Sequence, residues 1–330
     1  MESENKDVIH VVLAFYDPKG TYSQHAGVAM VSIFERTKRS VCVHILHDET
    51  LTEHNRSFLS ETAESFNQQV AFHDVSPYMS QLEDIIPRLP MGQVTIGTLF
   101  RMAIQDVLPL EKVIYLDCDV VVNMDIQEFW DVPLEGNSIA GVLDVNRSRF
   151  SLRMRLMGCD WKTYINNGVL LMDLSRIREI FNIRKGVSWL TRYWIYVKHP
   201  GQDWMNACFR GDIKILGCRF NNLNGKYHDV ADSILHLTVK PWEDPKNSAA
   251  GLYWRAFLKT PWGRLSSEEV AYMMIDIFQK APSTHRRTAQ CYRKIFHRLW
   301  TDVFSNTAVR ATGLVKFLYY ETKFFFTRGK

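Results

Sequence analysis

Residues 112–125 read Lys-Val-Ile-Tyr-Leu-Asp-Cys-Asp-Val-Val-Val-Asn-Met-Asp. They predict a buried strand over 112–116 that runs directly into two carboxylates, Asp117 and Asp119, with more apolar residues behind them. Burying such carboxylates unpaired costs on the order of several kcal/mol, so we expect a cation beside them, either Arg or Lys or a metal. Oxygen ligands of this kind favour Mg²⁺ or Mn²⁺, usually shared with a substrate phosphate.

Strands and helices alternate on both sides of this segment. Continuous apolar runs such as Val8–Phe15 are typical of buried parallel strands, and Thr52 is the expected N-cap of a polar amphipathic helix. This alternation predicts an α/β domain with a mainly parallel sheet. Ligands bind beyond the carboxyl ends of the strands in such sheets, where we expect Asp17 and Asp117 to lie together. The expected strands are 8–15, 41–46, 70–75, 112–116, 138–143, 164–172, 213–216 and 233–237, and the expected helices are 23–36, 52–66, 95–107, 175–181, 186–197 and 202–209.

The 330 residues have an ordinary globular composition, with 46% hydrophobic residues, 23% charged residues and a formal net charge of +4. The six cysteines show neither a CxxC spacing nor a disulfide framework. No run of about 18 apolar residues predicts a membrane-spanning helix, and the first residues do not form a secretory signal peptide. We therefore expect a cytoplasmic protein.

The charge is concentrated near the end of the chain. Residues 281–330 hold ten basic and two acidic side chains, a balance of +8 (10 − 2), which leaves −4 (4 − 8) for the rest. We expect an α/β domain at 1–245 and a helical, basic and aromatic extension at 246–330. Segment 285–330 either docks on an anionic membrane surface, at the inner face of the cell membrane, or packs its apolar stripe on the first domain. No nucleic-acid-binding motif accompanies the charge, so we expect no such partner.

Three further motifs have a chemical interpretation and a structural one. His236-Leu237-Thr238-Val239-Lys240-Pro241-Trp242 offers an imidazole to a metal and a lysine to a phosphate, or is a core histidine before a turn. Asn166-Asn167-Gly168 offers two amides that suit sugar hydroxyls, or forms a turn. Gly201-Gln202-Asp203 begins a helix, whose dipole favours an acidic group there.

Taken in chain order, these motifs match one pattern. The chain resembles the retaining glycosyltransferases of family 8, which include bacterial lipopolysaccharide galactosyl- and glucosyltransferases and glycogenin. The resemblance covers roughly residues 8–245. Six segments carry it: Val-Val-Leu-Ala-Phe-Tyr-Asp at 11–17, Leu-Phe-Arg-Met at 99–102, Tyr-Leu-Asp-Cys-Asp at 115–119, Asn-Asn-Gly-Val-Leu-Leu-Met-Asp-Leu at 166–174, Gly-Gln-Asp-Trp-Met-Asn at 201–206 and His-Leu-Thr-Val-Lys-Pro-Trp at 236–242.

The resemblance implies a GT-A, Rossmann-like fold that binds a UDP-sugar together with Mn²⁺ or Mg²⁺. The positions that match the family's metal ligands, including its DxD motif, are Asp117, Asp119 and His236. The positions implied to bind the UDP-sugar are Ala14, Asp17, Tyr22, Arg101, Asp117, Cys118, Asn167 and Lys240. The positions implied to hold the transferred sugar and to support catalysis are Asp144, Asn166 and Gln202.

The resemblance further implies a retaining hexosyltransferase that moves glucose or galactose from UDP-glucose or UDP-galactose to a glycan, lipid-linked or protein-linked acceptor. A divalent ion and Lys240 would stabilise the leaving diphosphate. Gln202 matches the family's nucleophile position, but an amide is a poor nucleophile, so we favour front-face attack by the acceptor with Gln202 as an electrostatic support.

Two departures from the family pattern support an alternative. Gly201 stands where the family often has an acid, and the closing loop of residues 236–242 is shortened. The alternative is therefore a catalytically impaired UDP-sugar-binding partner of another glycosyltransferase. A nicotinamide-dependent oxidoreductase is excluded, because no GxGxxG follows the first strand.

Overall fold

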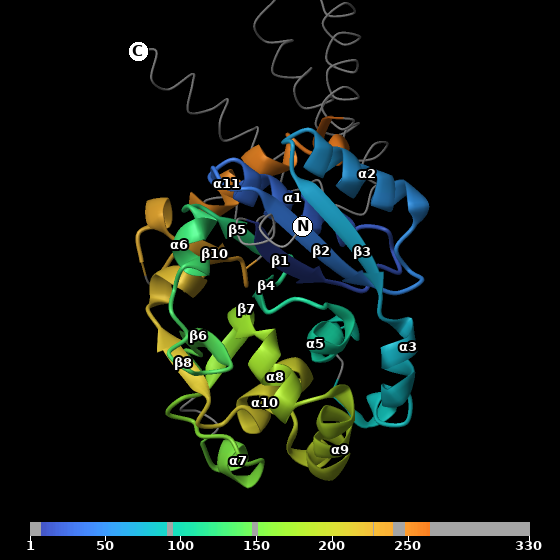
Figure 1. The fold of residues 1–330 in the computed structure, drawn as a ribbon, viewed down its shortest axis with the longest axis vertical. Coiled ribbons are helices and arrows are strands. Elements are labelled where there is room, and N and C mark those ends of the chain that lie inside the picture. Colours follow the sequence, from blue (N-terminus) through green and yellow to red (C-terminus); the bar gives the residue numbers. More distant parts are fainter. Residues whose placement is uncertain (1–7, 91–94, 147–150, 227, 240–247, 265–330) are drawn as a thin grey trace, which may run out of the picture.

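The computed structural model describes residues 8–90, 95–146, 151–226, 228–239 and 248–264. A seven-stranded sheet runs through the middle of this part of the chain, with helices on both of its faces (Figure 1). Only β7 runs against its neighbours, so the predicted mainly parallel sheet is confirmed. The strands, in spatial order, are β3 (Gln69–Asp74), β2 (Val41–His47), β1 (Ile9–Ala14), β4 (Lys112–Leu116), β7 (Ile165–Asp173), β6 (Ile139–Leu143) and β8 (Ile213–Leu216).

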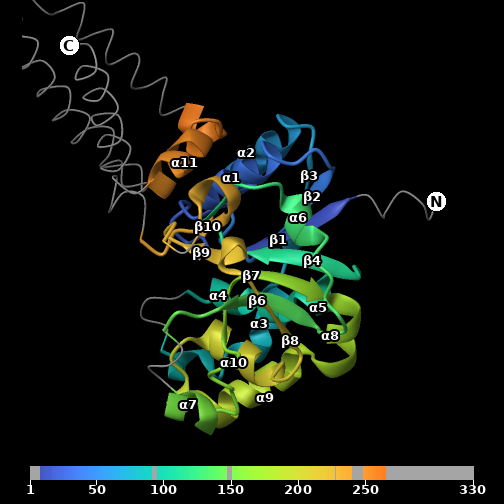
Figure 2. The same ribbon diagram turned by 90° about the vertical axis from the view of Figure 1, so that its left-hand side faces the viewer.

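Two groups of helices cover the sheet, as the views in Figures 1 and 2 show. Successive side chains of a strand point to opposite faces. Val11 and Leu13 of β1 therefore belong to one apolar cluster, and Val12 and Ala14 belong to the other. The first cluster contains residues of α1 (Ser23–Phe34), α2 (Glu53–Glu64), α6 (Ile126–Trp130) and α11 (Ser248–Phe257). The second contains residues of α3 (Ser76–Met79), α4 (Gly97–Phe100), α5 (Ile104–Val107), α7 (Ser151–Leu156), α8 (Leu174–Ile180), α9 (Ile183–Tyr193) and α10 (Pro200–Cys208).

A small second sheet adjoins the carboxyl end of β4. It consists of β5 (Val120–Val122), β10 (Ile234–His236) and β9 (Asn222–Leu223). β10 pairs antiparallel with β5 and aligns His236 with Val120. This pairing brings the end of β10 to the turn that carries the two carboxylates.

The expected helix over 95–107 is broken into three pieces, because a 3₁₀ turn at Arg101–Ala103 separates α4 from α5. The Arg101 Nε donates to the carbonyl oxygen of Thr98 at 3.0 Å. An uninterrupted α-helix would pair that carbonyl with the amide of Met102. The N-cap of α2 is confirmed, since the Thr52 hydroxyl accepts from the amide of Asn55 at 3.2 Å.

Helix α11 lies just beyond the boundary expected near residue 245 and packs on α1. The hydroxyl of Tyr253 lies 2.6 Å from His25 Nδ1, and the indole of Trp262 donates to Asn55 at 3.2 Å. Residues 248–264 are therefore part of the packed α/β unit. In the portion of the chain that the structure describes, no helix combines the length and apolarity needed to cross a bilayer.

Candidate active site

Three potential metal ligands converge beyond the carboxyl end of β4. Asp117 and Asp119 flank the turn between β4 and β5, and His236 ends β10. One ligand atom from each of the three lies within 4.8 Å of the others. His236 Nε2 is 3.4 Å from Asp119 Oδ1. The structure thus brings together all three residues predicted to bind the metal, and two carboxylates with one imidazole form a donor set that suits Mn²⁺.

The backbone of Gly168 lies directly against this cluster of three side chains. The amide of Asp117 donates to the Gly168 carbonyl oxygen at 2.7 Å. A Cβ atom added to Gly168 would lie 2.3 Å from His236 Cε1 and 2.8 Å from Asp117 Oδ2. Both distances are far below normal contact, so only glycine allows the imidazole and the carboxylate to meet over this strand.

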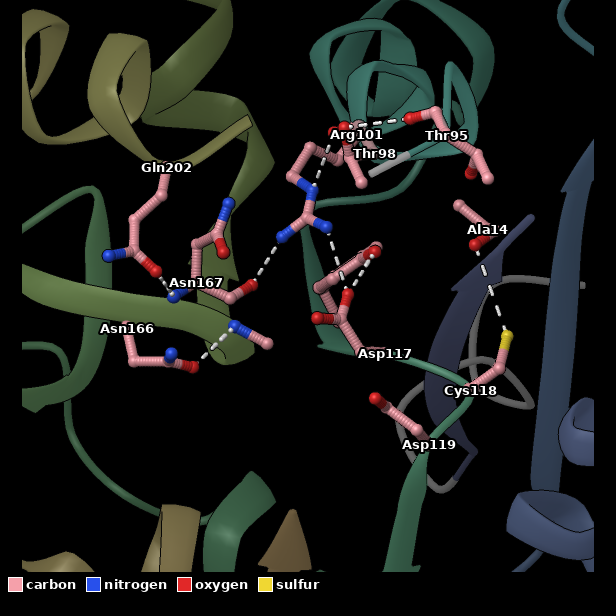
Figure 3. Close-up of polar contacts among 12 residues, drawn as sticks. Ala14, Thr95, Thr98, Arg101, Asp117, Cys118, Asp119, Asn166, Asn167 and Gln202 are labelled. Atoms are coloured by element: carbon pink, nitrogen blue, oxygen red, sulfur yellow. Dashed lines mark hydrogen bonds and ion pairs between the residues drawn. The ribbon is translucent and has the colours of Figure 1, made fainter. Parts of the chain in front are cut away.

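A buried arginine fixes the orientation of Asp117. Arg101 donates to Asp117 Oδ1 at 2.9 Å and to the carbonyl oxygen of Asn167, as Figure 3 shows, while the Tyr115 hydroxyl donates to the same Oδ1 at 2.7 Å. Burial acts to lower the pKa of Arg101, but the charge of the adjacent Asp117 carboxylate acts against it and the net shift is upward. With Oδ1 engaged by two donors, Oδ2 faces Gly168 and His236. Arg101 is thus a cation of the kind predicted from the sequence to lie beside the two carboxylates, and a metal ion could bind there in addition.

His236 is oriented by two side-chain amides in series, of which the sequence pointed to Asn166 but not to Asn221. His236 Nδ1 lies 3.0 Å from Asn221 Oδ1, and Asn221 Nδ2 donates to Asn166 Oδ1 at 2.9 Å. A proton on Nδ1 satisfies the first of these bonds and leaves Nε2 as the ligand atom. Asn166, which we expected to contact the transferred sugar, therefore contacts Asn221, the residue that holds His236. Its role toward the sugar stays a prediction. The only local signal for Asn221 is the Asn-Asn pair that it forms with Asn222, where a 3₁₀ helix ends and β9 begins.

The other two residues expected at the sugar are in contact with each other. Gln202, near the start of α10, donates from Nε2 to Asp144 Oδ2 at 3.1 Å. Its Oε1 accepts from the amide of Asn167 at 3.3 Å. Asn166 and Asn167 are neighbours on β7 and project to opposite sides (Figure 3). The contact with Gln202 is made by the backbone amide of Asn167, and both ends of the Gln202 side-chain amide have a partner.

The start of α10 is held by Asp203, which is completely buried. Its carboxylate accepts from Arg153 at 2.8 Å, from the Tyr164 hydroxyl at 2.5 Å and from the amides of residues 198 and 199. At the adjacent Gly201, an added Cβ would lie 2.7 Å from the Thr98 carbonyl oxygen. No side chain fits at this position without displacing α4, which is a packing reason for the glycine.

The residues expected to hold the nucleotide lie at the end of β1. The Asp17 carboxylate accepts from the amides of residues 21, 22 and 23, so it also organises the turn before α1. Burial first, and then the charge of Asp119, raise the pKa of Tyr22 well above its usual value. The Cys118 thiol points to the carbonyl oxygen of Ala14, 3.9 Å away, so the backbone of Cys118 is what faces the site (Figure 3). Lys240 lies outside the described residues.

Known proteins share this sequence pattern and fold. The model for glycosyl transferase family 8 matches residues 14–245. Lipopolysaccharide 1,2-glucosyltransferase of Escherichia coli is 24% identical over 269 residues, which cover 73% of this chain and 76% of that protein. General stress protein A of Bacillus subtilis is 23% identical over 204 residues, which cover 60% of this chain and 65% of that protein. The chain thus spans less than two thirds of that second relative.

A solved structure gives the same result for the fold. The galactosyltransferase LgtC in complex with donor and acceptor sugar analogues matches with a TM-score of 0.66 at 22% identity, over 77% of this chain and 96% of that chain. The fold is the GT-A fold that the sequence predicts.

Proposed function

Because this chain belongs to glycosyl transferase family 8, it is a glycosyltransferase, and we propose that it moves glucose or galactose from a UDP-sugar to a glycan, lipid-linked or protein-linked acceptor. We propose further that the reaction retains the anomeric configuration and requires Mn²⁺ or Mg²⁺. The observation that carries the proposal is the convergence of Asp117, Asp119 and His236 within 4.8 Å at the carboxyl edge of the sheet.

The three side chains fit a divalent ion. Asp117 Oδ2, Asp119 and His236 Nε2 would hold it, and when bound it supplies positive charge to a leaving diphosphate. Arg101 keeps Asp117 in one orientation, and Asn221 keeps the His236 tautomer that leaves Nε2 available. Pre-set charges of this kind lower the barrier, because they need no reorganisation as charge develops.

Gln202 and Asp144 would act on the sugar side. The Gln202 amide is held between Asp144 and the amide of Asn167, so it presents a fixed dipole in place of a mobile nucleophile. This arrangement supports front-face attack by the acceptor, with Gln202 stabilising the positive charge that forms on the sugar ring. The anomeric configuration of the product, measured by NMR, tests the retaining outcome.

The relatives guide the choice of donor and acceptor. One is a lipopolysaccharide 1,2-glucosyltransferase and one solved relative is a galactosyltransferase, so glucose and galactose are the first donors to test and lipid-linked glycans are the first acceptors. We also propose that segment 285–330, outside the described residues, docks the enzyme on anionic membrane. Deleting it should reduce binding to phosphatidylglycerol vesicles more than it reduces donor hydrolysis; equal vesicle binding would contradict the docking.

Release of UDP from a panel of UDP-sugars, with and without Mn²⁺, tests the function. Asp119→Asn is the sharpest variant, because it removes the charge of one candidate ligand while both members of the buried Arg101–Asp117 pair stay in place. We expect release to stop in EDTA and in Asp119→Asn, and to persist in the control Glu64→Gln, which alters an exposed carboxylate on α2.

Two results would contradict parts of the proposal. Unchanged UDP release in EDTA and in Asp119→Asn would remove the metal role. Binding of UDP-glucose or UDP-galactose without any release of UDP or hexose would favour the alternative, a UDP-sugar-binding partner of another glycosyltransferase.

A further inference from the structure

A second group of potential ligands lies at the opposite end of the sheet from the candidate active site. It consists of His10 near the amino end of β1 and of Cys42 and His44 in the first half of β2, and we call it the amino-end cluster; His73, near the carboxyl end of β3, lies beside His44. The register pairs His10 with Cys42, Val12 with His44 and Leu46 with His73. These four side chains therefore project from the same face of three adjacent parallel strands.

The side chains meet closely within this cluster. One ligand atom each from His10, Cys42 and His44 lies within 4.8 Å of the others, and His10 Nδ1 is 3.0 Å from His44 Nε2. Two nitrogens bound to one tetrahedral Zn²⁺ lie about 3.3 Å apart, given Zn–N bonds of about 2.0–2.1 Å. The observed pair is thus slightly closer than a zinc ion requires, and a small opening would admit one.

His73 orients the middle histidine. Its Nε2 lies 3.1 Å from His44 Nδ1, so His44 can donate from Nδ1 to His73 while Nε2 turns toward His10 and Cys42. Metal-bound histidines commonly use their second nitrogen in this way.

We propose that His10, Cys42 and His44 form a second metal site, separate from the catalytic one, that takes Zn²⁺, with His73 as a positioning residue. Two imidazoles and a soft thiolate form a donor set that favours zinc, whereas the carboxylate-rich catalytic cluster favours Mn²⁺. Binding forms a Zn–S bond, and the Cys42 thiol proton passes to solvent. The ion would tie β1 to β2 at their amino ends. Without an ion, His10, His44 and His73 contact one another through their ring nitrogens.

Cobalt is the probe that separates the two sites. Metal-free full-length protein titrated with Co²⁺ should develop a thiolate-to-cobalt charge-transfer band at one equivalent, and Zn²⁺ should abolish it. The catalytic cluster contributes two carboxylates and one imidazole, so it cannot produce this band. The band should also persist in Asp119→Asn, which makes the result independent of the proposed transferase function.

Variants then assign the ligands. Cys42→Ser should lose the band, whereas Cys208→Ser, a half-buried cysteine on α10, should keep it. His73→Phe should keep the band but weaken Co²⁺ binding by about 10–100-fold, the usual effect of removing such a partner. Far-UV circular dichroism shows that each variant is folded. The proposal is overturned if folded wild-type protein gives no band, or if the band survives in Cys42→Ser.

Discussion

Gly168→Ala should disable the metal cluster while leaving the fold in place. The new methyl carbon would lie 2.3 Å from His236 Cε1. Carbon atoms in contact normally lie about 3.5–4.0 Å apart, so the imidazole must retreat by more than about 1 Å. Metal sites tolerate deviations of only about 0.2 Å in ligand distance. A misplacement of about 1 Å costs on the order of 100-fold in rate, and we expect a loss of this size in metal-dependent UDP release.

The assay measures Mn²⁺ affinity by calorimetry, UDP release at saturating Mn²⁺, and the free energy of unfolding in urea. Overpacking at this site should lower the free energy of unfolding by about 1–3 kcal/mol, which leaves a folded protein to measure. Gly217→Ala is the matched control, because an added Cβ there meets nothing within 4 Å. Wild-type Mn²⁺ affinity and turnover in Gly168→Ala would refute the argument that His236 and Asp117 meet over this glycine to hold the ion.

Three further predictions concern the supports of the site and the fold. Arg101→Met should lower the free energy of unfolding by about 3 kcal/mol, because it leaves Asp117 without its buried partner. This value is at the low end of the usual cost of breaking a buried ion pair, since Asp117 keeps some solvent access; an unchanged urea midpoint would contradict the prediction. Asp203→Asn should lower it by about 2 kcal/mol, because the buried carboxylate accepts several bonds at the start of α10, and calorimetry should find Mn²⁺ affinity unaltered. Deleting 248–330 should lower the melting temperature further than deleting 265–330, because only the longer deletion removes α11 from the apolar cluster that it shares with α1; equal melting of the two truncated proteins would argue against packing of α11.

Much of the architecture could be predicted from local patterns. Apolar runs gave the strand at 112–116 to the residue, and Thr52 marked the start of α2, because burial and capping act within a few residues of the chain. The helix expected over 95–107 is present over 97–107, but a 3₁₀ turn interrupts it where the Arg101 side chain donates to a carbonyl that an α-helix would use. That bond depends on where Asp117 and Asn167 hold the guanidinium.

Within the site, the sequence predicted a cation beside Asp117 and offered His236 as a ligand. It did not predict Asn221, because this residue acts through a contact between two segments far apart in the chain. The same limit applies to the amino-end cluster. His10, Cys42 and His44 looked like parts of ordinary strands until the register of β1 with β2 placed them together.

The sequence by itself determined the α/β class, the family and the three residue types that meet at the candidate metal centre. These follow from periodicity and from motif order, which local interactions encode. The tertiary structure alone decided the rest: that Arg101 holds one oxygen of Asp117, that Gly168 leaves room for the imidazole, and that Asn221 contacts the Nδ1 atom of His236. Each of these depends on distances of a few ångströms between strands and turns, and only the packed sheet fixes such distances.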